Sequence, residues 1–75
     1  MNYIEIKHLK MIQAIEEAGN MTRAAKRLFI SQSALSQQLK DIETKLSAAL
    51  FFRTSKKMIL TRTGRKLLSA ARQTI

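Results

Sequence analysis

The sequence lacks cysteine and proline, and its 75 residues include only two glycines, Gly19 and Gly64. Without cysteine, neither disulfides nor thiolate metal sites are available to the chain. Because proline and glycine are the strongest interrupters of helices, their scarcity predicts a mainly helical protein. Apolar runs stay far below the ~20 residues of a membrane helix. The start, MNYIEIKHLK, alternates charged and apolar residues and does not resemble a secretory signal, so we expect an intracellular, cytoplasmic protein.

Groups that carry catalysis are also scarce. The chain has one histidine, His8, five scattered acidic residues and no glycine-rich phosphate loop. No pair of these groups has a spacing that suits nucleophilic or acid–base chemistry. We therefore predict that the chain is not an enzyme and holds neither a metal nor a cofactor.

Negative charge is rare and unevenly distributed. Residues 1–20 carry two lysines and three glutamates, a sum of −1, whereas residues 21–75 carry twelve lysines or arginines and two acids, a sum of +10. Such a gradient indicates a polyanionic partner, either nucleic acid or an anionic membrane surface. The basic residues are spread over several predicted elements, whereas a membrane-binding helix concentrates them on one face. We therefore expect no membrane partner.

The first half of the chain has the pattern of three helices. Apolar residues at helical spacing predict a helix over residues 4–18, and Gly19 suits the position just past its end. Asn20 is a good N-cap for a short helix, MTRAAKRLF, and Ser31 is a good N-cap for a longer one. In the longer helix, leucines and isoleucines step by four, three and four. Its opposite face carries Gln32, Ser33, Ser36, Gln37, Lys40 and Thr44.

The second half predicts a hairpin and a last helix. Two short apolar stretches, Leu50–Arg53 and Met58–Thr61, flank a basic tip. Thr61 or Thr63 then suits the N-cap of a helix that still continues at Ile75, so we expect a fragment of a longer protein. Phe29, Phe51 and Phe52 each lie in an apolar run, and we expect all three in the core.

A short helix, a tight turn and a longer helix with a polar face form the helix-turn-helix pattern, and the hairpin is typical of a wing. The longer helix is then expected in a DNA major groove, where amides and hydroxyls hydrogen-bond base edges. The base-contacting candidates are Gln32, Ser33, Ser36 and Gln37. The candidates for the DNA backbone or the wing are Thr22, Ser31, Lys40, Arg53, Lys56 and Lys57.

Three plainer interpretations stay open at this point. The serines and glutamines also fit a merely solvated helix face. The basic tip also fits a charged turn that keeps an edge strand from aggregating. The basic region alone would suit a non-specific architectural or RNA-binding protein, for which any polyanion would bind about equally well.

The order of these motifs resembles the N-terminal DNA-binding domain of LysR-type transcriptional regulators over nearly the whole chain. The residues that carry the resemblance are Gly19, Ala24, Ala25, Leu28, Ser31, Gln32, Ser36, Glu43, Leu46, Leu50, Phe51, Arg53, Leu60, Thr61 and Gly64. The stretches IEIKHLK and QSALS resemble one subgroup, the regulators of methionine biosynthesis. Two departures stand out: Ser47 replaces the family's glycine after Leu46, and Gln37 stands where arginine is frequent.

The resemblance implies a winged helix-turn-helix over residues 1–61 and the start of a linker helix over residues 62–75. It further implies sequence-specific binding to double-stranded DNA at interrupted inverted repeats. It also implies a homodimer paired through the linker helix, a tetramer in the full-length protein, and a small-molecule effector held by a C-terminal domain that this chain does not include. The pairing face would include Leu67, Leu68 and Ala71.

Overall fold

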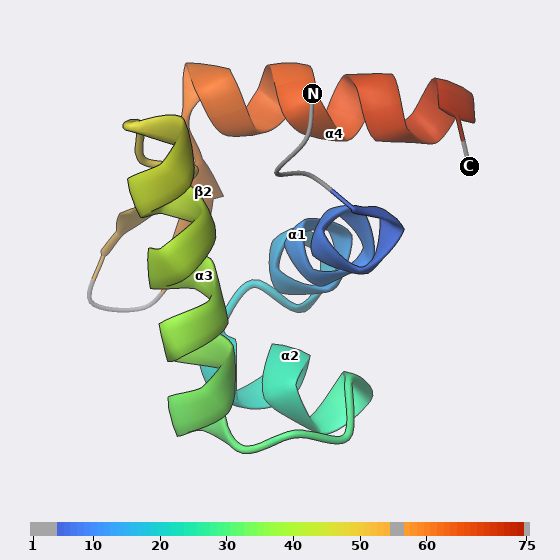
Figure 1. The fold of residues 1–75 in the computed structure, drawn as a ribbon. Helices are drawn as coiled ribbons and strands as arrows, with labels where there is room; N and C mark the ends of the chain where they lie inside the picture. Colours follow the sequence, from blue (N-terminus) through green and yellow to red (C-terminus); the bar gives the residue numbers. More distant parts are fainter. Residues whose placement is uncertain (1–4, 55–56, 75) are drawn as a thin grey trace.

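The computed structural model describes residues 5–54 and 57–74, with side chains through Ala70. Within them the predicted winged helix-turn-helix is confirmed (Figure 1). The two strands form an antiparallel hairpin in which Phe52 lies opposite Ile59. In chain order the elements are α1 (Ile6–Ala18), α2 (Met21–Arg27), α3 (Gln32–Leu46), β1 (Phe51–Arg53), β2 (Met58–Leu60) and α4 (Arg62–Thr74).

The predicted caps define the helix boundaries. Gly19 ends α1 with a φ of 79°, a backbone conformation that glycine adopts without steric cost. The side-chain oxygen of Asn20 accepts a 2.8 Å hydrogen bond from the N–H of Arg23. Ser31 caps α3 in the same way, accepting from the N–H of Ala34 at 3.1 Å. With these short-range contacts, four residues separate the end of α2 from the start of α3.

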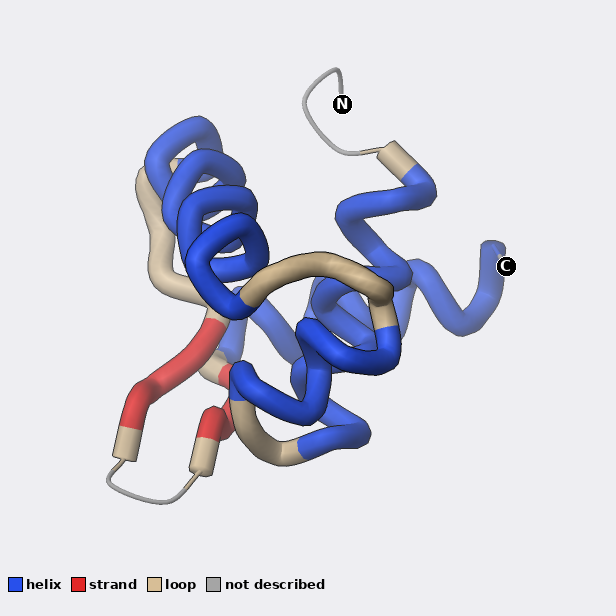
Figure 2. Tube along the Cα trace, turned by 90° about the horizontal axis from the view of Figure 1, so that it is seen from below, coloured by secondary structure: helices blue, strands red, loops and turns tan. Residues whose placement is uncertain are grey.

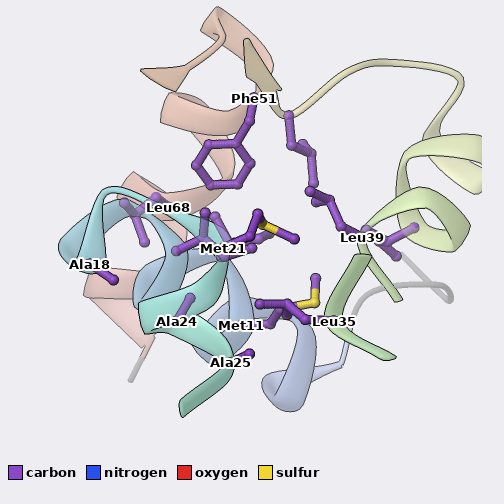
Figure 3. Packing of buried hydrophobic residues seen from close by; sticks show 13 residues of the cluster. Met11, Ala18, Met21, Ala24, Ala25, Leu35, Leu39, Phe51 and Leu68 are labelled. Carbon is purple, nitrogen blue, oxygen red and sulfur yellow. The ribbon is translucent and has the colours of Figure 1, made fainter. Parts of the chain in front are cut away.

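One hydrophobic core joins the helices to the base of the hairpin. Figure 3 shows Phe51 and Leu68 reaching the cluster that also contains Met21 and Leu39. Burial of each large apolar side chain contributes about 1.5–3 kcal/mol. The buried apolar residues are Met11, Ile12, Ile15, Ala18, Met21, Ala24, Ala25, Leu35, Leu39, Ile42, Leu50, Phe51 and Leu68.

The aromatic residues correct one expectation. Phe51 is buried as predicted, but Phe29 is 94% exposed and Phe52 is 60% exposed. Phe52 follows Phe51 in a strand, where successive side chains point to opposite faces, so it lies outside with Ile59. Phe29 has a left-handed φ of 59° in the turn after α2. The prediction that phenylalanines in apolar runs are buried was therefore correct for Phe51 and wrong for Phe29 and Phe52.

A small set of hydrogen bonds fastens the hairpin to the helices. The carboxylate of Glu43 in α3 accepts from the N–H of Leu50 at 2.6 Å. The hydroxyl of Thr61 donates to the carbonyl of Ala49 at 2.6 Å and accepts from the N–H of Gly64 at 3.1 Å. Thr61 therefore caps α4, as predicted for one of the two threonines, while also holding the chain that enters β1.

Gly64 tests this junction. A methyl group at Gly64 would overlap the carbonyl oxygen of Leu50 and lie 2.9 Å from Cδ2 of Leu60. Because the carbonyl belongs to backbone that cannot move away freely, Gly64→Ala is expected to lower the free energy of unfolding by about 1–3 kcal/mol. Urea denaturation followed by circular dichroism measures the change. Ser69→Ala, at an exposed position of α4, is the control, and equal stability of the two variants would contradict the overlap.

Ser47 offers the opposite effect. It ends α3 with φ 53° and ψ 37°, a left-handed conformation that costs a residue with a Cβ roughly 1–2 kcal/mol. Ser47→Gly is expected to raise the free energy of unfolding by about 0.5–1 kcal/mol, since part of this gain is offset by the flexibility of glycine in the unfolded chain. The measurement is again urea denaturation. Ser47→Ala keeps the Cβ and is expected to give no such gain, so equal stabilisation by both variants would refute this cause.

Candidate nucleic-acid interface

The interface begins where the first turns of α2 and α3 meet. Residues 28–31 connect the two helices, and the hydroxyl of Thr22 donates to Oε1 of Gln32 at 3.1 Å. Each of these residues lies in the first turn of its own helix. The hydrogen bond between Thr22 and Gln32 therefore joins the two helices, in addition to their packing in the hydrophobic core.

One face of α3 is buried and the other is polar. Leu35, Leu39 and Ile42 fill the core, whereas Gln32, Ser33, Gln37 and Lys40 are exposed and Ser36 is half-buried. The exposed face lines a hollow of about 540 Å³. Its lining residues are Gln32, Ser33, Ser36, Gln37, Lys40 and Arg53. The structure therefore brings all four base-contacting candidates together, and it adds a wing arginine to them.

A second hollow of about 250 Å³ adjoins the first, because Gln32 and Arg53 line both. It lies between the start of α2 and the hairpin, where Thr22, Thr54 and Lys57 contribute to its wall. Figure 2 shows the hairpin projecting from the body next to the start of α2. We call the two hollows together the polar groove.

The polar groove is electropositive. Lys40, Arg53 and Lys57 line it, and none of its described lining residues is an acid. The free N–H groups at the start of α3 add further positive potential. In the described part of the chain, no group of three histidines or acids is placed to hold a metal ion. The groove therefore suits an anionic polymer that also presents hydrogen-bonding groups.

The remaining site candidates are either engaged in other contacts or lie outside the described residues. Ser31 uses its oxygen to cap α3, which leaves its hydroxyl proton to donate. Lys56 lies outside the described residues. Leu68 is 2% exposed, so its side chain belongs to the core of its own chain and not to the open pairing face predicted for it. Leu67 is partly buried against the same core, and the side chain of Ala71 lies outside the described part.

Sequence reasoning missed Thr54 and Asp41. Thr54 lines the groove and accepts from the N–H of Lys57 at 2.8 Å, which closes the hairpin. Asp41 accepts a 2.9 Å hydrogen bond from Nε2 of Gln37. Both contacts could have been predicted from the sequence. A threonine at a tight turn commonly hydrogen-bonds the local backbone, and residues four apart on a helix face each other.

Among the described residues, no helix combines the length and apolar character needed to cross a bilayer. The fold and the groove together define a winged helix-turn-helix protein. A family model described as "Bacterial regulatory helix-turn-helix protein, lysR family" matches residues 6–65. The chain therefore belongs to the LysR family.

Among its relatives is the HTH-type transcriptional regulator MetR. The chain is 44% identical to MetR of Salmonella typhimurium over 72 residues, which are 96% of the chain and 23% of that relative. It is 43% identical to MetR of Escherichia coli (strain K12) over 72 residues, again 96% of the chain and 23% of the relative. The chain thus spans about a quarter of the length of these relatives.

Solved structures agree with the fold. The DNA-binding domain of CbnR, determined as a DNA complex, is 38% identical with a TM-score of 0.85, covering 95% of this chain and 82% of that one. The DNA-binding domain of BenM with catB site 1 DNA is 31% identical with a TM-score of 0.86, covering 95% and 79%. The expected LysR-type fold is confirmed.

The cations of the groove can be tested through salt dependence. Arg53→Ala and Lys57→Ala are each expected to weaken binding to every duplex alike and to reduce the slope of log affinity against log salt by about 1, because each removes one phosphate neutraliser. Fluorescence anisotropy at several salt concentrations measures this slope. Lys7→Ala, at the start of α1 and outside both hollows, is the charge-matched control. If its slope changes as much as theirs, the two residues do not contact phosphate.

Proposed function

We propose that this chain is the DNA-binding domain of a LysR-type transcriptional regulator and that it recognises specific sequences in double-stranded DNA. The single observation that carries this proposal is the first hollow, where Gln32, Ser33, Ser36 and Gln37 meet Lys40 and Arg53. Uncharged hydrogen-bonding side chains sit on the helix face, and cations border them. This arrangement suits base edges in the middle and phosphates at the sides.

In this proposal α3 enters the major groove, which is wide enough to admit a helix. Its first turn and a half then faces the bases, since the apolar stripe of Leu35 and Leu39 fixes which side points outward. Arg53 and Lys57 on the hairpin follow the backbone or the minor groove. The similar DNA-binding domains of CbnR and BenM, both determined as DNA complexes, support this assignment.

The larger assembly is also a proposal. We propose a homodimer paired through α4 that binds an interrupted inverted repeat. We further propose a tetramer and a small-molecule effector domain in the full-length regulator, which acts in the cytoplasm. The domain division proposed is residues 1–61 for DNA binding and residues 62–75 for the linker helix. Full-length CbnR, whose structure with target DNA has a TM-score of 0.84 to this chain, supports the longer architecture.

The alternative function is non-specific binding to any nucleic acid through charge alone. It makes no use of the ordered amides and hydroxyls in the first hollow. Family membership and the DNA complexes of its relatives favour the specific reader.

The two functions differ in one experiment. Ser36→Ala and Gln32→Ala are each expected to reduce discrimination between a selected duplex and a scrambled one by about 1–3 kcal/mol, since each removes a base contact. Anisotropy titrations at physiological salt measure both affinities. Thr44→Ala, on α3 but outside the hollow, is the control. An equal loss of affinity for both duplexes would leave only the charge-driven alternative.

A further inference from the structure

The two glutamines Gln32 and Gln37 of the polar groove are hydrogen-bonded to neighbouring side chains through opposite ends of their amides. Oε1 of Gln32 accepts from the hydroxyl of Thr22 at 3.1 Å, while Nε2 of Gln37 donates to Oδ1 of Asp41 at 2.9 Å. An unrestrained glutamine can turn its amide over, so it reads donors and acceptors alike. Here each amide has one end engaged by a neighbouring side chain. The described residues contain no further partner for Nε2 of Gln32 or for Oε1 of Gln37.

For Gln37 the chemistry leaves one orientation. An ionised carboxylate only accepts hydrogen bonds, so Asp41 holds the amide nitrogen and leaves the amide oxygen to the groove. The two residues are four apart in α3, the spacing at which Gln–Asp pairs form on a helix surface. Asp41 is exposed and does not line the groove. It therefore acts on the groove through Gln37.

For Gln32 the hydroxyl of Thr22 comes from a different helix. Thr22 lies in the first turn of α2, whose cap is made by the side chain of Asn20, so the Thr22 hydroxyl is available to donate its proton. That proton goes to Oε1 of Gln32. The amide nitrogen, with two N–H donors, is left for the groove.

We propose that these contacts divide the reading of bases between the two glutamines. Gln32 presents a donor and selects a base acceptor, which is O4 of thymine, O6 or N7 of guanine, or N7 of adenine, so it disfavours only cytosine. Gln37 presents an acceptor and selects an amino group, which is N4 of cytosine or N6 of adenine. Thr22 and Asp41 are positioning residues that set this polarity. The inference rests on the proposed function, since it assumes that α3 lies against base edges.

The test is selection from a random duplex library with the 75-residue chain, followed by sequencing to give base preferences at every position. The wild type is expected to show one position that disfavours cytosine and another that prefers cytosine or adenine on the contacted strand. Asp41→Ala is expected to lower the preference at the second position only, by roughly tenfold, the worth of one base contact. Glu17→Ala removes the same charge from α1, outside the groove, and is expected to keep both preferences.

The other glutamine has its own matched pair. Thr22→Val removes the hydroxyl while keeping the branched shape, and it is expected to weaken the selection against cytosine at the Gln32 position only. Thr22→Ser restores the hydroxyl and is expected to restore the preference. A purely structural or phosphate-binding role of Thr22 would change affinity for all duplexes and leave the base preferences as they were.

The outcomes separate the two levels of the argument. If the wild type selects a site and both Asp41→Ala and Thr22→Val keep its preferences unchanged, the polarity proposal is overturned while the proposed function stands. Loss of the same position in both variants also overturns it. If the wild type enriches no sequence at all, the proposed function fails, and the polarity proposal falls with it.

Discussion

The hydrogen bond from the N–H of Leu50 to the carboxylate of Glu43 determines where the hairpin stands. Glu43 belongs to the last turns of α3, so the chain that enters β1 is fixed to the same helix that presents the polar face. Partial burial strengthens such a charge-assisted bond, because water competes less for the carboxylate. Thr61 holds the neighbouring carbonyl of Ala49 from the other side. These two bonds hold the base of the hairpin beside α3, where Arg53 joins the polar residues of the helix in lining the first hollow.

Local sequence signals predicted most of the fold. Gly19, Asn20 and Ser31 are cap residues whose conformation depends on neighbours within four positions, and the structure places each as predicted. The polar face of α3 was equally readable, since the leucine stripe leaves only one side for it. Structural features that depend only on residues close in sequence, such as helix caps and the exposed face of a helix, can therefore be predicted from short segments.

Properties that depend on distant contacts were harder to predict. Phe29 and Phe52 were expected inside because apolar runs do not say which way the backbone turns. Leu68 was expected on an open face, whereas the crossing of α1 by α4 buries it. The Thr22–Gln32 contact joins residues ten apart, so no single-helix pattern indicates it. Of the candidate site, the residue types were predictable, but their orientations needed the tertiary structure.

Arg53 has a consequence for how the groove distributes its binding free energy. Arg53 and Gln32 line both hollows, and Lys57 from the hairpin lines the second. Free energies of independent sites add, whereas those of groups with a shared neighbour contain a coupling term of about 0.5–3 kcal/mol. In the proposed DNA complex, the effects of substitutions at Gln32 and Arg53 on binding free energy are therefore expected not to be additive. A substitution on the helix face is then expected to change how much Arg53 contributes to the overall affinity.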